Sequence, residues 1–396
     1  MSLKKIFIFI AVLPVITLLG VLGVWAEEIE TAWDGGFVDV HMHLDGVQNK
    51  GTDATAQRNF QNEAEGPPWM PPEARKRMAM RRRMMSQQQT DAGDHTASAD
   101  HLIAMMDQAG VRKAIVMPPP QTRGRPGAYP YTALLDSVKK YPGRLILGAG
   151  GGELNPMIQE TKASEVNEKI LEAFKAKTVE IVQAGAHVFG EMTALHICMN
   201  PKHNYEASPP DHPLFLLLAD LSAQYDIPID LHMEAIAEDL QTPKNLLQAC
   251  SQNPSVLSAT LPAFERLLDH NRGARIVWQH IGWDNIGQMT PSLLRELLAK
   301  HPNLYIAIKA VPNAETARMN RIHDDNYTVL PEWLALFESF SDRFVVGADE
   351  FARAENMQGG YKKPPFFDVT WQTMLSLPPR LRKKIGGENA ARIYRL

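Results

Sequence analysis

The sequence has few cysteines and little net charge. These two features argue against a disulfide-rich protein and against a nucleic-acid-binding protein. Two cysteines in 396 residues are too few for a framework of disulfides, even in an oxidising compartment. The formal net charge of −4, from 41 basic and 45 acidic residues, creates no strong field and gives no reason to expect a nucleic-acid partner. We therefore expect a globular protein with an ordinary apolar core.

Long apolar runs are also absent, except at the N-terminus. Lys4 and Lys5 precede an apolar run from Ile6 to Trp25, and acidic residues follow Ala26. This pattern is typical of a secretory signal peptide, so we expect residues 1–26 to be removed and the remainder to be periplasmic or secreted. The run is close to the roughly 20 residues that span a bilayer, so an uncleaved membrane anchor is the alternative.

The two cysteines, Cys198 and Cys250, permit one disulfide bridge. Such residues are more often small buried hydrophobic side chains. Their separation along the chain does not decide whether the two Cα atoms lie close enough to be joined, so both alternatives stay open.

Short segments rich in β-branched residues alternate with amphipathic stretches, which is typical of repeated βα units. The predicted strands are Phe37–His43, Val111–Met117, Arg144–Ala149, Ala186–Met192, Ile227–Met233, Arg275–Ile281, Leu304–Ile308 and Phe344–Ala348. Eight such units close an α/β fold of the (β/α)8 TIM-like barrel type, and we expect residues 27–396 to form this single domain. An open, doubly wound sheet is the alternative.

The stretch between the first two predicted strands is too long for a single helix, so residues 44–96 are expected to form an insertion. Its centre carries two Pro-Pro pairs, followed by arginines that alternate with methionines. We interpret it as a solvated helix or as a lid, because loops at the C-terminal ends of barrel strands cover active sites. A basic lid that attracts an anionic substrate or lipid head groups is the alternative.

Two histidines near the end of the first strand suggest a metal site. His41 and His43 are two residues apart, so on a strand both point to the same side. We expect both imidazoles to face the barrel interior, where neutral nitrogen ligands suit zinc. The opposite, helix-facing side is expected to carry Val38, Val40, Met42 and Leu44.

Further ligand-type side chains end other predicted strands: Glu191, His232, His280 and Asp349. Because the C-terminal ends of all barrel strands meet at one mouth, these side chains are expected to converge with the first two histidines on one or two divalent ions, zinc first among them. Glu191 is placed to bridge two ions. Each residue alone is more often structural, and a non-catalytic barrel that merely holds a ligand or metal is the alternative.

Lys309 follows the seventh predicted strand and shares its inward face with Tyr305 and Ala307. A buried lysine needs a partner, so it is either paired with a carboxylate or available to bind an anionic group of the substrate. Three more histidines, in a stretch rich in proline and asparagine, are expected to be structural or substrate-facing; they are His196, His203 and His212. The tryptophans on either side of His280 are expected to pack in the core.

Several of these segments together resemble the amidohydrolase superfamily, and in particular its amidohydrolase-related branch. The segments are Asp39-Val40-His41-Met42-His43, Asp211-His212-Pro213-Leu214 with residues 227–232, Gln279-His280-Ile281-Gly282, Gly347-Ala348-Asp349 and residues 387–394. The resemblance covers most of the chain after residue 26. It implies a distorted barrel, usually with zinc, in which His41, His43, His232 and Asp349 bind the metal. It implies that His280 is a second metal ligand or a partner of the nucleophilic water.

Two departures from the family pattern concern the substrate and the number of metal ions. Many members have Gly-Ser-Asp, an aromatic residue and proline after the last strand, where this chain has Gly347-Ala348-Asp349-Glu350-Phe351. Some binuclear relatives carry a lysine that becomes carboxylated at the end of the fourth strand. This chain has Glu191 there instead, and in this it resembles the deoxyribonuclease-like metal hydrolases of the superfamily. A binuclear site is thus allowed but not required.

The expected activity is metal-dependent hydrolysis of an amide, ester, lactone or related C–N or C–O bond in a small molecule. Asp349 is expected to take the proton of the activated water and return it to the leaving group. The metal and a protonated His280 are expected to stabilise the oxyanion. The alternative is a zinc-dependent, non-oxidative decarboxylase that resembles aminocarboxymuconate-semialdehyde decarboxylase. The sequence identifies neither the substrate nor the oligomeric state, and a homo-oligomer stays open.

Overall fold

The computed structural model describes residues 36–46, 95–120, 129–199, 204–313, 319–354 and 365–396. The predicted signal peptide, residues 1–26, lies outside these ranges, as do residues 47–94 of the predicted insertion. Within the described ranges, no helix combines the length and the apolar character that crossing a bilayer demands.

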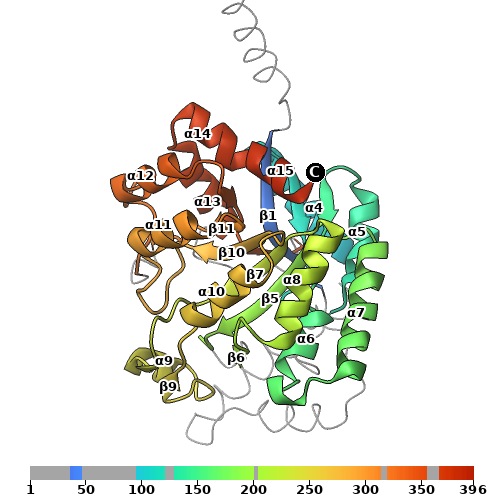
Figure 1. Cartoon of the computed structure of the whole chain (residues 1–396). Helices are drawn as coiled ribbons and strands as arrows, with labels where there is room; N and C mark the ends of the chain where they lie inside the picture. The colour runs from blue at the N-terminus through green and yellow to red at the C-terminus, as the bar shows by residue number, and fades with distance from the viewer. Residues whose placement is uncertain (1–35, 47–94, 121–128, 200–203, 314–318, 355–364) are drawn as a thin grey trace, which may run out of the picture.

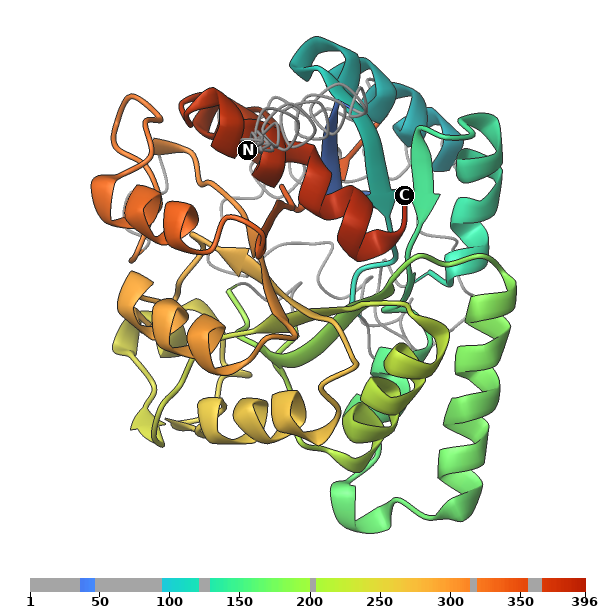
Figure 2. The ribbon, with the colours of Figure 1, turned by 45° about the horizontal axis from the view of Figure 1, so that its top comes forward.

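The described chain contains a ring of parallel strands surrounded by helices (Figures 1 and 2). The ring consists of β1 (Phe37–Leu44), β2 (Val111–Val116), β3 (Leu145–Leu147) with β4 (Ala149–Gly150), β5 (Phe189–His196), β7 (Ile229–Met233), β10 (Ile276–Ile281), β11 (Leu304–Ile308) and β12 (Phe344–Val346). The main crossover helices are α4 (His95–Ala109), α5 (Leu135–Lys140), α7 (Glu168–Gln183), α8 (Pro213–Tyr225), α10 (Leu261–His270), α11 (Pro291–Lys300) and α12 (Pro331–Ser339). All eight predicted strands are present.

Smaller helices and strands lie outside the ring of parallel strands. They are α6 (Leu154–Gln159), β6 (Glu206–Ala207), β8 (Leu240–Gln241), α9 (Lys244–Ala249), β9 (Val256–Leu257), β13 (Glu350–Ala352), α13 (Phe366–Leu375), α14 (Pro379–Lys383) and α15 (Asn389–Tyr394). β13 pairs with β1, and β6 pairs with β5, at the ends of these strands that carry the histidines.

The ring closes through a single divided strand. β3 pairs with β2, and β4, which begins after Gly148, pairs with β5. Gly148 N donates to Val116 O at 2.9 Å, and Ala149 N donates to Val188 O at 3.1 Å, so the hydrogen bonding passes from one neighbour to the other. β1 pairs with both β2 and β12, which completes the circle. The chain therefore folds as the predicted (β/α)8 barrel and not as an open sheet.

Local sequence explains where several helices begin. Pro213 occupies the first turn of α8, and the His212 side chain accepts a hydrogen bond from Leu214 N. The other ring nitrogen of His212 lies 2.9 Å from Thr161 O, so this histidine is structural, one of the two roles expected for it. Thr290 caps α11 in the same way, through a hydrogen bond from Leu293 N.

Two apolar layers hold the barrel together. The outer layer lies between strands and helices and includes Met42 and Trp278. The inner layer fills the ring and joins the C-terminal helix α15, which lies across one end of the barrel (Figure 2). Its members are Val38, Val40, Ile115, Met117, Val188, Val277, Ala307, Val345, Ala390, Ile393 and Tyr394. One end of the ring is thus filled with apolar side chains, and the polar groups gather at the other end.

The predicted faces of the first strand are wrong for two residues. Val38 and Val40 belong to the inner layer and do not face the helices. The pairing of β1 with β2 shifts register between Asp39 and Met42, and the Asp39 carboxylate accepts a hydrogen bond from His41 N at 3.1 Å. This irregularity interrupts the alternation of side chains, so an inward valine is followed directly by an inward histidine.

The two cysteines form a disulfide, which decides between the two alternatives that the sequence left open. Cys198 and Cys250 are both buried, with their Cα atoms 5.7 Å apart. The bridge ties the segment after β5 to the end of α9. Asn253 bonds both the main-chain N and O of Cys198, at 2.9 and 2.8 Å, and holds the same segment. The C-terminal end of β5 is therefore firmly anchored beside the site described next.

Candidate metal centre

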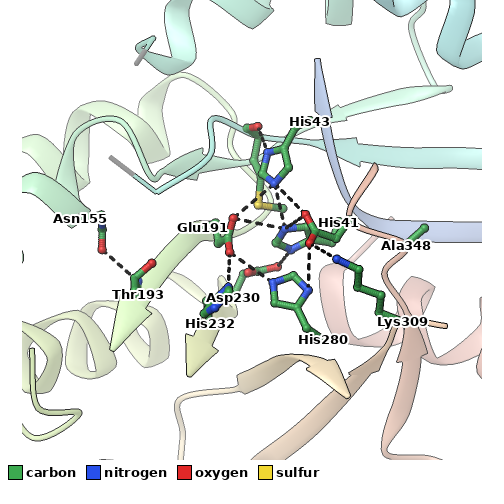
Figure 3. A network of polar contacts seen from close by, with 12 residues as sticks. His41, His43, Asn155, Glu191, Thr193, Asp230, His232, His280, Lys309 and Ala348 are labelled. Atoms are coloured by element: carbon green, nitrogen blue, oxygen red, sulfur yellow. Dashed lines mark hydrogen bonds and ion pairs between the residues drawn. The ribbon is translucent and has the colours of Figure 1, made fainter. Parts of the chain in front are cut away.

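The six predicted metal ligands meet at the C-terminal end of the ring. Figure 3 labels five of them, all but Asp349. β1 supplies His41 and His43, β5 supplies Glu191, β7 supplies His232, β10 supplies His280, and the segment after β12 supplies Asp349. Three overlapping groups of three, each with its ligand atoms within 4.8 Å of one another, include all six residues. Side chains that lie far apart in the sequence therefore surround one small volume.

Glu191 lies between two pairs of imidazoles. Its Oε2 is 3.5 Å from His41 Nε2 and 3.3 Å from His43 Nε2. Its Oε1 is 2.8 Å from His232 Nδ1 and 3.3 Å from His280 Nε2. The two oxygens of one carboxylate thus face two different half-sites, as a bridging ligand requires.

Asp349 lines the opposite side of the same volume. Its Oδ1 is 3.4 Å from His43 Nε2, and its Oδ2 is 3.5 Å from His280 Nδ1. Both Asp349 and His280 have left-handed backbone, with φ of 53° and 66°. Such a conformation is unfavourable for a residue with a side chain, and it is tolerated where the surrounding structure and the function of a site impose it.

The hydrogen bonds behind the first two histidines fit metal binding. His43 Nδ1 lies 2.8 Å from Met117 O, and because a carbonyl can only accept, this ring nitrogen carries the proton. When the ring is neutral, His43 Nε2 therefore has its lone pair towards the cluster, 3.1 Å from His41 Nε2. Two lone pairs at that separation repel unless positive charge lies near both. The donor set therefore suits a divalent cation.

The charges of the cluster lead to the same conclusion. Burial lowers the pKa of His43, but hydrogen bonds with Asp349 and Glu191 outweigh it and raise the pKa to about 9. Burial raises the pKa of Glu191, but the charge of His41 and the hydrogen bond from His232 bring it well below its usual range. The carboxylates are therefore ionised and require positive charge. Protons on the imidazoles supply it in the metal-free protein, and a bound metal would displace them.

His280 differs from the sequence-based expectation. Burial lowers its pKa to about 3, despite the opposing influence of Asp349 and Glu191. The imidazole is therefore neutral near pH 7, and the expectation of a protonated His280 is wrong for this structure. A neutral ring is the form that ligates a metal.

Lys309 has a carboxylate partner. Its Nζ is 2.5 Å from Asp349 Oδ2 and 4.4 Å from the ring centroids of both Trp283 and Phe366. The ammonium is thus held between two aromatic faces and an anion. Trp283 was expected to pack in the core, but it is only half-buried, and its ring faces the Lys309 ammonium. Trp278 is buried in the outer layer, as expected.

Replacing Lys309 with methionine is expected to make folding stability depend more strongly on zinc. Removing one partner of a buried ion pair leaves an uncompensated charge, here Asp349, at a cost of about 3–5 kcal/mol. Zinc beside Asp349 would supply the missing positive charge, so the rise in Tm on adding zinc should be larger in K309M than in the wild type. Calorimetry of both proteins, with and without zinc, measures this rise in Tm. K384M, which breaks the exposed pair with Asp342, is the control, and equal zinc-dependent shifts would contradict the expectation.

Sequence reasoning missed Asp230, which lies 2.9 Å from His41 Nδ1. A signal was available, because Asp230 is two residues before His232 and so shares its inward face. His196, at the end of β5, lies with its ring centroid 5.0 Å from that of His232, beside the cluster. His203 lies outside the described residues.

Part of the chain matches a known protein family. A sequence model described as amidohydrolase matches residues 200–396, a segment that includes His232, His280 and Asp349. No curated protein shows significant similarity to the chain.

Solved structures with a similar fold include three of interest. A TIM-barrel protein from Bordetella bronchiseptica is 13% identical, with 91% of this chain and 98% of that chain covered and a TM-score of 0.47. A uronate isomerase from Bacillus halodurans is 12% identical, with 94% and 96% covered and a TM-score of 0.47. A protein engineered for organophosphate hydrolysis from a weak, promiscuous lactonase template is 13% identical, with 91% and 96% covered and a TM-score of 0.48. Residues 200–396, which carry half of the ligand cluster, thus belong to the amidohydrolase family.

Proposed function

We propose that this protein is a zinc-dependent hydrolase that cleaves an amide, ester, lactone or related bond in a small molecule. The family supports an enzyme of the amidohydrolase type. The observation that carries the metal dependence is the placement of Glu191 between two imidazole pairs, each facing one carboxylate oxygen. A donor set of imidazoles and carboxylates suits zinc, and the two half-sites favour two ions over one.

The donors divide between the two half-sites. His41 and His43 would hold one ion, and His232 and His280 the other, with Glu191 shared. When bound, zinc acts as a Lewis acid and makes water a nucleophile at neutral pH. His41 is fully buried, whereas the side chains of His232 and Asp349 are each 15% exposed. The substrate therefore approaches from the side of these two residues.

Asp349 is placed to move the proton. Burial raises its pKa, but the charge of Lys309 and the hydrogen bond from His43 outweigh it and keep the pKa well below its usual range. The carboxylate is thus ionised at neutral pH, with one edge towards the first-strand histidines. From this position it can accept a proton from water and return it to the leaving group. Lys309 limits the motion of the carboxylate while this happens.

Metal quantification tests the proposal directly. The wild type, dialysed in excess zinc and then freed of unbound ion, should retain two zinc ions per chain by mass spectrometry of the metal. Glu191→Gln should retain at most one, because the amide loses the charge that both half-sites share. Glu206→Gln is the matched control, since that buried carboxylate bonds Asn155 and not the cluster. A wild type that binds no zinc would contradict the proposed function.

A substrate panel then distinguishes hydrolysis from decarboxylation. Amides, esters and lactones should yield hydrolysis products with the zinc-loaded protein, and aromatic or unsaturated acids should release no CO₂. Release of CO₂ without hydrolysis would instead assign the decarboxylase alternative that the sequence raised.

We also propose that the mature protein is exported. The N-terminal pattern up to Ala26 and the buried disulfide between Cys198 and Cys250 support this, because such bridges persist mainly in oxidising compartments. Cell fractionation, with N-terminal sequencing of the isolated protein, should find a chain that starts at Glu27 outside the cytoplasm. A membrane-bound chain that keeps its first residues would support the anchor instead.

A further inference from the structure

We propose that Asp230 is a positioning residue that fixes the orientation of His41 for metal binding. The inference rests on the proposed function, and nothing in the family match assigns a role to this residue. Asp230 Oδ2 lies 2.9 Å from His41 Nδ1, and both side chains are fully buried (Figure 3). The contact joins strands that are 189 residues apart in the sequence.

An imidazole can ligate a metal through only the nitrogen that carries a lone pair. A carboxylate that accepts the proton of Nδ1 leaves Nε2 as that nitrogen, fixes the ring plane and makes the ring a better donor. His41 Nε2 is the atom that faces His43, Glu191 and Asp349. Asp230 therefore acts through His41 and does not need to touch metal or substrate.

The surrounding backbone leaves room for this carboxylate. A Cβ placed on Gly190 would lie 2.7 Å from Asp230 Cβ and 3.2 Å from its Cγ. Side chains do not tolerate so short an approach, so a residue without a side chain at 190 permits Asp230 to reach His41. The residue after this glycine is Glu191, the carboxylate between the half-sites.

One strand thereby serves both half-sites. β7 presents Asp230 and His232 on the same inward face, two residues apart. Asp230 orients a ligand of the first half-site, and His232 lies in the second. In contrast, His43 Nδ1 is held by the main-chain carbonyl of Met117, which no substitution removes. Of the two described partners of these Nδ1 atoms, Asp230 is thus the one that a substitution can change.

Asp230 makes few other contacts, which argues against a purely structural role. Its Oδ1 has no hydrogen-bond partner among the described residues. A buried carboxylate with an unpaired oxygen costs free energy, and its bond to His41 is the interaction that offsets this cost. Asp284 shows what a structural carboxylate looks like here, because it accepts hydrogen bonds from the main-chain N–H groups of Ile286, Gly287 and Met289.

The test compares Asp230→Asn with Asp284→Asn as the control. D230N should lower zinc affinity about 10- to 100-fold in competition with a chelator, the usual effect of losing such a partner. It should also change the visible spectrum of the cobalt-substituted protein. D284N should leave both unchanged, and thermal unfolding establishes that each variant is folded. If D230N binds zinc as tightly as the wild type and has the same cobalt spectrum, the inference is overturned.

A second readout keeps this test separate from the proposed function. If the wild type binds no zinc, the proposed function fails, and ring-nitrogen NMR of the metal-free chain decides the inference. D230N should then shift the Nδ1 resonance of His41 and leave that of His43 in place, because the latter is bonded to a carbonyl. Unchanged resonances for both rings would show that Asp230 does not position His41.

Discussion

Replacing Asp349 with asparagine is expected to lower kcat by about 10²- to 10⁴-fold while leaving part of the zinc bound. The amide keeps one oxygen near His43 and so retains a weak ligand, but it cannot accept a proton as the carboxylate does. General acid–base groups typically contribute rate factors of this size. The ammonium of Lys309 also loses the anion that lies 2.5 Å from it. Zinc content and steady-state kinetics, measured on the same preparation, separate these effects.

Glu350→Gln is the matched control for this variant. Glu350 is the next residue, but its carboxylate accepts a hydrogen bond from Phe367 N and is no part of the cluster. E350Q should keep both zinc and kcat. If D349N loses all zinc, Asp349 is chiefly a ligand, and the base is another group. If D349N keeps its zinc and its kcat, no proton passes through this side chain.

The sequence predicted most of the barrel because its strands are short, rich in β-branched residues and, apart from the long stretch between the first two, regularly spaced. It could not predict the division of the third strand at Gly148, since the hydrogen bonds that pass there from one neighbour to the other are long-range. It also assigned Val38 and Val40 to the wrong face. Alternation assumes regular pleating, and the hydrogen bond from His41 N to the Asp39 carboxylate breaks that regularity.

The ligands themselves were predictable for a topological reason. Residues at the C-terminal ends of parallel barrel strands share one mouth, so strand ends alone bring His232, His280 and Asp349 together. The partners that orient these groups were harder to predict. Asp230 lies close to His41 only because two distant strands enter one ring, and the partner of Lys309 lies 40 residues along the chain. The sequence indicates the face of a strand on which a side chain lies, but not the residues from other strands that the side chain contacts.

The same limit applies to charge. From the sequence, a protonated His280 was predicted to stabilise the oxyanion together with the metal. The structure buries this ring, and desolvation keeps it neutral. The cation beside Asp349 is Lys309 instead, held between the rings of Trp283 and Phe366. Burial, which single positions in a sequence do not reveal, decides which of two basic residues is charged.

Replacing His41 with alanine should have the largest effect of any single change. Its ring contacts His43, Glu191 and Asp349 through Nε2, and Asp230 through Nδ1. The variant should lose the zinc of the first half-site and lower kcat by at least about 10³-fold, since the metal supplies several kcal/mol of transition-state stabilisation. It also leaves the buried carboxylate of Asp230 without its partner, so Tm should fall as well.

Removal of zinc by a chelator provides the comparison that isolates the metal. Chelated wild type should lose activity to the same extent and regain it when zinc is returned, whereas H41A should stay inactive at the same zinc concentration. His187→Gln is the matched control, because that ring bonds Tyr394 O at the far end of the barrel, among the apolar inner layer. A chelated wild type that remains fully active would refute zinc dependence. An H41A variant that recovers wild-type kcat in zinc would show that the metal is held without the first strand, and that His41 is only a core histidine.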